Sequence, residues 1–489
     1  MTSLRQRFRA SAAETIDADL IIAASRLPYE LVEDESGRPG WQRSPGGLVS
    51  ALAPVLRDRN ALWVGWGGRT HGTEAHPNAK APSLPADDDY CRLGEVVIDA
   101  KVAQAYSEGF CNSAIWPLYH NGVVTPTFHR ADFQAYRIVN AQYAEHIAHE
   151  AGQGATVWIQ DYQLQLVPQM LRDLRPDLRI GFFLHIPFPP QELFAQLPWR
   201  RQILEGLLGA DLIGFQTQEA ADNFLALAHR LLGLRIGGDR VEIESLDGVR
   251  DAVVQAFPIG IDAEKYQALA QDPSVVERGK QIRVEMGSPK TLVLGVDRLD
   301  YTKGIGVRLR AYAEHVANLP ADQRDVIMLQ IATPSRERIE DYRRLRDEVE
   351  LAVGRANGDL GTTDYRPIHY LHKNYDDAEL VAMYLAADVM LVTPLADGMN
   401  LVAKEYVASR VDEGGALVLS EFTGAANQLS DAWLVNPYDV DAVRRAIGEA
   451  IAATPAERSR RMINMRTNVF EQDVWRWFST FMTALGEPR

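Results

Sequence analysis

The chain has 489 residues, of which 46% are apolar and 24% are charged. This composition excludes a globally disordered protein and is enough for two or three domains that each bury a core. The 66 acidic residues outnumber the 51 lysines and arginines, which gives a formal net charge of -15. Because no stretch gathers basic residues as a phosphate-binding surface does, we expect neither a nucleic acid nor a membrane as a partner.

The two cysteines and the N-terminal residues indicate the compartment. Cys91 and Cys111 form no C-x-x-C motif and no Cys/His cluster, which excludes a disulfide framework and a structural zinc site and is typical of a reducing cytosol. Residues 1–19 lack the apolar core of a signal peptide, and no window approaches the roughly 20 apolar residues of a membrane span. We therefore expect a cytoplasmic protein.

Short β-branched apolar runs alternate with amphipathic stretches, which is the pattern of parallel sheets covered by helices on both faces. In chain order, the first series predicts strands at 19–24, 61–65, 156–160, 179–185 and 211–215, and helices at 134–149 and 163–174. The second series predicts strands at 292–296, 326–332, 368–371, 388–392 and 416–420, and helices at 303–318, 336–355 and 376–387. The predicted fold class is α/β, with two Rossmann-like doubly wound domains.

Turn chemistry and composition predict the domain boundaries. The join lies within 254–262, where Phe257-Pro258-Ile259-Gly260 ends a strand. We assign residues 1–255 to an N-terminal domain, 256–470 to a C-terminal domain, and 471–489 to an aromatic helix that packs back on the first domain. Two segments rich in Gly, Pro and charge follow strands of the first domain and are either ligand-closing loops or surface excursions. They are Pro28–Gly47 and Gly67–Arg92.

Cofactor and metal motifs are missing from the sequence. No G-x-G-x-x-G follows a predicted strand and no Walker G-x-x-x-x-G-K-[ST] occurs, which disfavours an NAD(P) oxidoreductase. Two Rossmann-like halves without these motifs are typical of two-domain nucleotide-sugar glycosyltransferases, which work in a cleft. The D-x-D-like acidic spots at 17–19, 87–89 and 439–441 do not follow strands of the second domain. We expect no cofactor and no metal.

The first candidate ligand turn in the second domain carries Arg298 and Lys303. Both flank the end of a predicted strand, so a guanidinium and an ammonium can point at one diphosphate. Charges five residues apart are more often ordinary surface residues, but Gly304 lets the backbone that follows approach a phosphate. We predict a diphosphate clamp.

The second candidate turn leads from Thr393 into a predicted helix, with Asp397 before it and Glu405 inside it. The helix N-terminus would face an anion, and the two carboxylates could accept hydrogen bonds from sugar hydroxyls. The alternative is an N-cap aspartate and a solvated glutamate.

In the first domain, polar residues follow three predicted strands. His185 precedes Pro187, so its ring can leave the sheet, although a core histidine is the usual explanation for such a position. Asp161 ends another strand, and Arg26 follows the first. The amides of 44–48, Ser-Pro-Gly-Gly-Leu, could cradle a phosphate or a sugar.

Four long motifs together resemble the trehalose-6-phosphate synthases, which are family 20 retaining glycosyltransferases. The resemblance runs from Ile21 to about Trp477 and rests on Trp158-Ile-Gln-Asp-Tyr, Gly181-Phe-Phe-Leu-His-Ile-Pro-Phe-Pro, Asp297-Arg-Leu-Asp-Tyr-Thr-Lys-Gly and Asp397-Gly-Met-Asn-Leu-Val-Ala-Lys-Glu-Tyr. It implies the two-domain GT-B architecture and transfer of glucose from a nucleotide-glucose to glucose 6-phosphate, giving α,α-trehalose 6-phosphate. We expect a homo-oligomer, a dimer or a tetramer.

The resemblance also implies roles for individual residues. The catalytic group consists of Arg298, Lys303, His185 and Asp397. The expected donor contacts are Gly47 of a Gly-Gly loop, the possible base-stacking Tyr375, and Gly398, Met399, Asn400, Leu401 and Glu405. The expected acceptor contacts are Arg26, Tyr106, Ser107, Trp116, Asp161 and Arg336.

One position departs from the family pattern. The family commonly has two adjacent tyrosines ten and nine residues before the tryptophan of its Trp-Pro, and here the pair is Tyr106-Ser107. Because the second tyrosine would reach the acceptor phosphate, we expect a weaker grip on that phosphate.

The resemblance implies that the departing phosphate oxygen takes the acceptor proton, with no covalent carboxylate nucleophile. A non-catalytic sugar-phosphate sensor would not keep the clamp, and a starch- or glycogen-type transferase would not need Arg26 and Arg336. UDP-, ADP- and GDP-glucose all stay open as donors.

Overall fold

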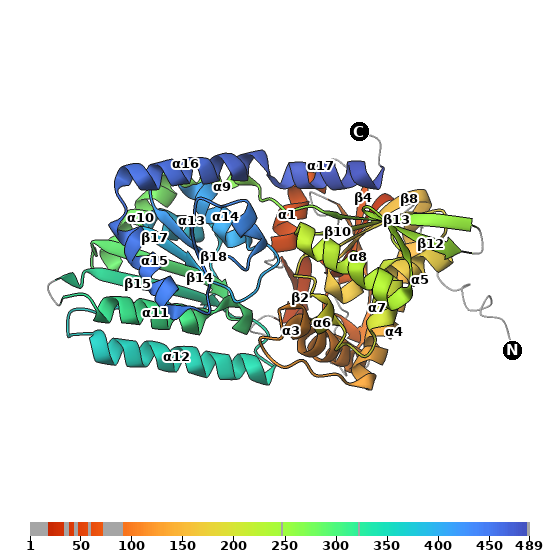
Figure 1. The fold of residues 1–489 in the computed structure, drawn as a ribbon, viewed down its shortest axis with the longest axis horizontal. Coiled ribbons are helices and arrows are strands. Elements are labelled where there is room, and N and C mark those ends of the chain that lie inside the picture. The colour runs from red at the N-terminus through yellow and green to blue at the C-terminus, as the bar shows by residue number, and fades with distance from the viewer. Residues whose placement is uncertain are drawn as a thin grey trace.

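The computed structural model describes residues 18–33, 39–43, 47–56, 60–71, 91–245, 248–320 and 323–486. Two lobes lie side by side along the longest axis of the molecule, and each is built around its own sheet (Figure 1). Among the described helices, none combines the length and the apolar character that crossing a membrane requires.

The first lobe contains a nine-stranded sheet whose seven successive strands from β6 to β13 run parallel, with β12 and β11 antiparallel at one edge. After β1 the chain builds β4 and β6 on one side and then β8 onward on the other, so the topological switch point lies between β1 and β8. The order is β6 (Arg92–Glu95), β4 (Ala61–Trp66), β1 (Ala18–Arg26), β8 (Ala151–Gln160), β9 (Arg179–Phe183), β10 (Leu212–Phe215), β13 (Gly248–Ala256), β12 (Arg240–Ser245), β11 (Arg235–Gly237).

The second lobe contains a six-stranded parallel sheet whose switch point lies between β14 and β17. Its central strands are almost entirely apolar and buried, as expected for strands covered on both faces. The order is β16 (Ile368–Leu371), β15 (Val326–Thr333), β14 (Thr291–Arg298), β17 (Val389–Val392), β18 (Ala416–Ser420), β19 (Trp433–Val435).

Helices cover both sheets. Those of the first lobe are α1 (Gly47–Leu56), α2 (Ala100–Gln104), the π-helix η2 (Ala105–Ile115), α3 (Trp116–Tyr119), α4 (Arg130–Glu150), α5 (Val167–Leu174), α6 (Gln191–Phe194), α7 (Arg200–Leu207) and α8 (Gln218–Leu232). Those that follow are α9 (Ala263–Gln271), α10 (Pro273–Glu285), α11 (Ile305–Ala317), α12 (Glu340–Leu360), α13 (Asp377–Ala386), α14 (Leu401–Ser409), α15 (Val440–Ala452), α16 (Pro455–Glu471) and α17 (Val474–Leu485).

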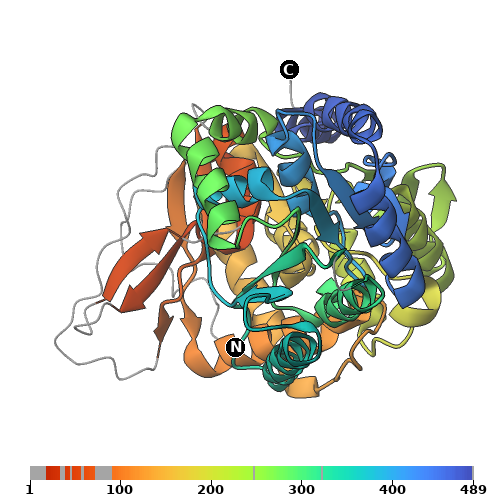
Figure 2. The ribbon, with the colours of Figure 1, turned by 90° about the vertical axis from the view of Figure 1, so that its left-hand side faces the viewer.

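The predicted α/β class is confirmed, and the differences are local. The strand predicted to reach His185 ends at Phe183, and the helix predicted from residue 163 begins at Val167 after a 3-10 turn. Segment Pro28–Gly47 contains the hairpin of β2 (Tyr29–Glu33) and β3 (Pro39–Arg43), which projects at one side of the molecule (Figure 2). The hairpin and the charged edge strands β11 and β12 were not predicted, because polar residues interrupt their apolar pattern.

The chain passes between the lobes twice, at 257–262 and again between α16 and α17 (Figure 1). The two passages lie side by side, because the Val474 N–H donates to the Ile261 carbonyl at 3.0 Å. Helix α17 then packs on the first sheet, where the Phe481 ring stacks on Trp158 with centroids 4.6 Å apart. The aromatic residues of this helix therefore join the end of the chain to the first lobe.

Candidate functional site

Each switch point carries charged residues at the carboxyl ends of its strands. In the first lobe, Arg26 ends β1 and Asp161 directly follows β8. In the second lobe, Arg298 ends β14 and the turn that contains Asp397 follows β17. Ligands of open α/β sheets bind at such points, so the fold presents both predicted groups where binding residues are expected.

The turn after β14 packs tightly against the segment after β17. Gly304 adopts a φ of 65°, in the left-handed region, and a Cβ at this position would lie 2.3 Å from the Thr393 carbonyl oxygen. Helix α11 starts at the next residue and carries Arg308, which is fully buried. Arg308 donates to Asp297 Oδ2 at 2.5 Å and to Thr393 Oγ1 at 3.0 Å. Through these bonds the buried Arg308 joins the end of β14 to the segment after β17.

Lys303 and Asp397 form an ion pair, with Nζ and Oδ2 2.5 Å apart. Burial alone raises the pKa of the Asp397 carboxyl, but the Lys303 ammonium and the Asn400 amide, which donates at 3.1 Å, hold this pKa below its usual value. Asn400 also caps α14, since its side chain accepts a hydrogen bond from the Ala403 N–H at 3.1 Å. The carboxylate is therefore ionised and fixed at the N-terminus of that helix.

Two further predicted donor contacts lie in the second lobe. Burial raises the pKa of Glu405 to about 7, although the Tyr384 hydroxyl donates to its carboxylate at 3.1 Å. Tyr375 lies between β16 and α13, and its ring centroid is 4.7 Å from Lys373 Nζ. Met399 and Leu401 flank the capping Asn400 within the same turn.

Trp116 joins the two lobes. Its ring lies 3.9 Å from the guanidinium carbon of Arg336 and 5.5 Å from that of Arg298, both of which belong to the second lobe. Arg336 Nη2 also donates to the Tyr162 hydroxyl at 3.1 Å. The structure thus brings together Trp116, Arg298 and Arg336. Trp116 and Arg336 are 220 residues apart in the sequence.

Asp300 holds Arg336 from within the second lobe and was not among the predicted site residues. This carboxyl is fully buried, accepts hydrogen bonds from Thr302 N at 3.0 Å and from the Tyr342 hydroxyl at 3.1 Å, and lies 3.4 Å from Arg336 Nη1. Burial alone would raise its pKa, but Arg336 and Arg298 lower it to about 2. Its fixed negative charge holds the guanidinium of Arg336 toward Trp116.

His185 and Asp161 lie together in the first lobe. The His185 N–H donates to Asp161 Oδ1 at 3.1 Å, and the His185 ring pairs with Gln160 Oε1 at 2.9 Å. Burial lowers the pKa of His185 to about 3 and raises that of Asp161 to about 6. The imidazole is therefore neutral at pH 7. A Cβ on Gly398 would lie 2.1 Å from the His185 carbonyl oxygen, so only glycine allows the lobes to meet here.

His120 is a residue of this region that the sequence reasoning missed. It is 2% exposed, its ring centroid lies 4.2 Å from that of Trp116, and its Nδ1 is 2.7 Å from the Trp116 carbonyl oxygen. Because a carbonyl only accepts, Nδ1 carries the proton. Burial lowers the pKa of His120 to about 4 despite Asp300 and Asp397. The sequence did contain a signal for it, because a residue four positions after Trp116 lies next to it on the same face of a helix.

Four predicted positions are less central in the structure. Tyr106 is 2% exposed, and its hydroxyl donates to the Gln163 carbonyl at 3.3 Å, so its side chain lies in the core of the first lobe. Ser107 is partly exposed in the same π-helix. Arg26 stacks over Trp66 at 4.2 Å and lies 3.6 Å from Glu30. Gly47 begins α1, whereas residues 44–46 of the predicted Gly-Gly loop lie outside the described residues.

Backbone strain gathers at the same residues. Non-glycine residues with positive φ include Asp161 at 73°, Arg336 at 50° and Asn400 at 72°. Each such conformation costs on the order of 1–3 kcal/mol and persists where the surroundings fix it, most often at functional sites. The three residues belong to three different predicted contacts of one site.

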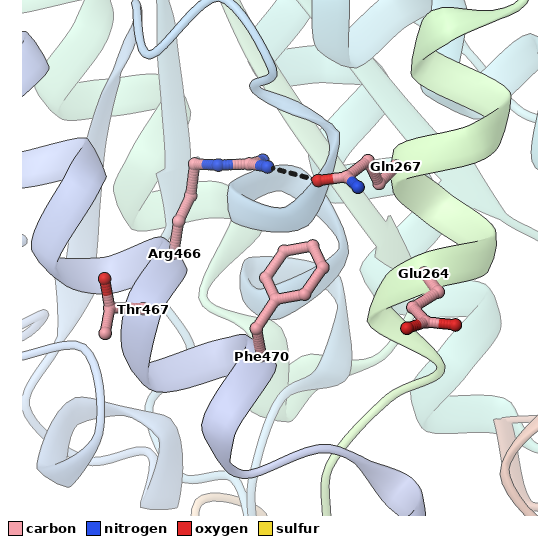
Figure 3. A pocket seen from close by; sticks show the side chains of 5 residues that line it. All are labelled: Glu264, Gln267, Arg466, Thr467 and Phe470. Carbon is pink, nitrogen blue, oxygen red and sulfur yellow. Dashed lines mark hydrogen bonds between the residues drawn. The ribbon is translucent and has the colours of Figure 1, made fainter.

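A cavity of about 260 Å³ lies between the lobes, and Tyr342 in its lining is hydrogen-bonded to Arg336. Asn112, Ser113 and Pro117 of the first lobe face Tyr301 and Tyr342 of the second across it. A larger depression of about 580 Å³ lies elsewhere, between α9 and α16 on the second lobe (Figure 3). The smaller cavity is lined by residues of both lobes, whereas the lining of the larger depression belongs to the second lobe.

The model of glycosyltransferase family 20 matches residues 18–487. The chain belongs to glycosyltransferase family 20. It is 50% identical over 474 residues to a trehalose-6-phosphate synthase of Mycolicibacterium vanbaalenii, with 96% of each chain covered. Membership of this family establishes the chain as a glycosyltransferase enzyme.

Solved structures agree with the family. A UDP-forming α,α-trehalose-phosphate synthase of Burkholderia xenovorans in complex with glucose 6-phosphate is similar with a TM-score of 0.85 and 32% identity, covering 96% of this chain and all (100%) of that one. An E. coli structure bound with UDP-2-fluoro glucose gives a TM-score of 0.84 and 31% identity, with 96% and 99% covered. These neighbours confirm the predicted GT-B architecture of two Rossmann-like domains.

Proposed function

We propose that this family 20 enzyme transfers glucose from a nucleotide-glucose to glucose 6-phosphate with retention, giving α,α-trehalose 6-phosphate and a nucleoside diphosphate. The observation that carries the proposal is the meeting of Arg298, Arg336 and Trp116 between the lobes. One guanidinium lies at the switch point of the second sheet and the other beside the first lobe, so two anionic substrates can be held next to one another near one indole ring.

The donor half of the proposal rests on the clamp of the second lobe. Arg298, Lys303 and the N-terminus of α14 would stabilise the negative charge that builds on the departing diphosphate. Asp397 is held ionised by Lys303 and would accept hydrogen bonds from glucose hydroxyls. Glu405 would accept from the ribose.

The acceptor half rests on polar groups left open in the first lobe. In the part of the chain that the structure describes, the buried Trp116 Nε1 has no hydrogen-bond partner, so it is available to an acceptor hydroxyl. Asp161 would bind the sugar, and Arg336 with Arg26 would bind the phosphate. The proposed reaction needs no carboxylate nucleophile, because the departing phosphate oxygen takes the acceptor proton on the same face of the sugar.

The similar proteins support this choice of substrates. The Burkholderia neighbour is UDP-forming and holds glucose 6-phosphate, and the E. coli neighbour holds a UDP-glucose analogue. UDP-glucose is therefore the first donor to test, followed by ADP- and GDP-glucose.

The test incubates the pure protein with each nucleotide-glucose and glucose 6-phosphate in EDTA, and measures nucleotide release together with the disaccharide phosphate. We expect an α,α-linked product by NMR and activity that EDTA does not abolish. Equal activity with plain glucose as acceptor, or a β linkage in the product, would contradict the proposal.

A further inference from the structure

Lys404 is a buried cation on α14 that the proposed chemistry does not use. It is 1% exposed, and its Nζ donates to the main-chain carbonyl of Ile259 at 2.6 Å. Within the described ranges no carboxylate lies at ion-pair distance from it, and burial lowers its pKa to about 7. Burying an ammonium without a counter-charge costs free energy, and the hydrogen bond to the Ile259 carbonyl offsets part of that cost.

Its acceptor, Ile259, lies in the first passage between the lobes. The N–H of the same residue donates to Gln216 Oε1 at 3.0 Å, and Gln216 directly follows β10 of the first lobe. One residue of the connecting segment is therefore bonded through its carbonyl to the second lobe and through its N–H to the first.

The passage has little room to move around this residue. A Cβ on Gly260 would lie 2.2 Å from the carbonyl carbon of Asp473 in the second passage, and the Val474 N–H bonds the Ile261 carbonyl. The backbone hydrogen bonds of both passages therefore constrain the angle between the lobes.

Helix α14 links this passage to the site. Asn400 caps the helix and Glu405 projects from it toward Tyr384, while the turn before it places Gly398 against the His185 carbonyl. A change in how α14 sits on Ile259 would therefore shift the donor turn relative to the first lobe. Donor contacts within the second lobe would stay as they are.

We propose that Lys404 is a positioning residue that, through the Ile259 carbonyl, holds α14 and its donor turn in register with the first lobe. The inference rests on the proposed function. It separates two properties, because the clamp of Arg298, Lys303 and the α14 N-terminus that would hold a nucleoside diphosphate lies in the second lobe, whereas turnover needs both lobes in contact.

The chain offers a matched control on the same helix. Arg466 of α16 donates to the Val407 and Ala408 carbonyls at the C-terminal end of α14, at 3.1 and 2.5 Å, and to Gln267 Oε1 at 2.8 Å. Figure 3 shows this arginine directed across the depression toward Gln267. Its contacts stay within the second lobe, so Arg466→Met loosens α14 without touching the bond to the passage.

The experiment compares Lys404→Met and Arg466→Met with the unmodified protein, using UDP as the probe ligand in calorimetry. For Lys404→Met we expect a UDP Kd within threefold of the unmodified value, a kcat at least tenfold lower, and a larger radius of gyration by X-ray scattering in UDP plus glucose 6-phosphate. Arg466→Met should keep kcat within threefold and lower only Tm.

A Lys404→Met protein with kcat within threefold of the unmodified enzyme would overturn the inference, as would parallel loss of UDP binding and kcat, which indicates a merely structural role. Gln216→Leu removes the other hydrogen bond of Ile259 and must likewise lower kcat while leaving the UDP Kd unchanged. This variant carries the test alone if Lys404→Met does not fold. If the unmodified protein forms no disaccharide phosphate, the proposed function fails, and the scattering comparison still decides the role of Lys404.

Discussion

The strand ends of the two lobes differ in how their charged side chains are held. In the second lobe, Lys303 is paired with Asp397 and Arg308 with Asp297, so two basic residues of the donor side have their counter-charges within the same lobe. In the first lobe, Arg26 is exposed over Trp66, and the second basic residue of the acceptor side, Arg336, comes from the other lobe.

In the proposed site, the ion pairs of the donor side therefore lie within one domain, whereas the two basic residues of the acceptor side come from different domains. Preorganised charges cost no rearrangement at the moment of reaction, which suits the group that receives the developing negative charge. A site completed across lobes forms only when the lobes meet, and it makes turnover depend on the arrangement of domains. Four experiments test this difference between the two sides.

The largest effect is expected from Arg308→Met, because it leaves the buried Asp297 carboxylate without its partner. Breaking a buried pair in this way costs about 3–5 kcal/mol of unfolding free energy. Urea denaturation measures the loss, and Arg310→Met is the control, since the side chain of Arg310 is 69% exposed. A loss below about 1 kcal/mol would show that the donor side is not held by this pair.

Next in size, Arg298→Ala and Lys303→Ala should each lower kcat by orders of magnitude. The expected cost is roughly 3 kcal/mol of transition-state stabilisation per residue, since both charges act mainly on the departing diphosphate. Steady-state assays with saturating substrates measure it, beside Arg310→Ala as a surface control. A tenfold or smaller loss of kcat for both variants would count against the clamp.

The pH dependence of stability tests His120, which lies where the two sides meet. Its pKa is lowered to about 4 in the folded protein from an ordinary 6.5, so between these values the unfolded chain binds a proton that the folded chain does not. Stability therefore falls as pH drops through this window, by up to about 1.4 kcal/mol per pH unit for one proton. Unfolding free energies are measured by denaturation at several pH values from 4 to 8. Their plot against pH should be flatter for His120→Gln than for the unmodified protein, and equal slopes would refute the buried neutral imidazole.

The smallest effect is expected at Ser107 on the acceptor side. Ser107→Tyr should lower the KM for glucose 6-phosphate several-fold, in line with about 1 kcal/mol for one added, partly solvated hydrogen bond. The KM for the nucleotide-glucose should stay the same and serves as the internal control. An unchanged or higher KM for glucose 6-phosphate would mean that this position does not grip the phosphate.

Some missed residues had a signal in the sequence and others had none. Arg308 shares one helical face with Ile305, Leu309 and Tyr312, at spacings of three and four residues, and this pattern predicts burial. Asp300 and Tyr162 meet Arg336 only through long-range packing, which local pattern does not encode. The burial of Tyr106 depends on an unusual π-helix, whose i→i+5 hydrogen bonding changes which residues share a face.

The sequence by itself determined the two parallel-sheet domains and the positions of Arg298, Lys303, Asp161 and Asp397 at strand ends, because apolar strand runs and the turns after them are local patterns. Only the tertiary structure decided that Arg336 of the second domain meets Tyr162 of the first, that Trp116 contacts two guanidinium groups, and that Lys404 bonds the interdomain passage. These contacts join residues far apart in the chain, and their geometry follows from how the lobes pack and not from any single segment.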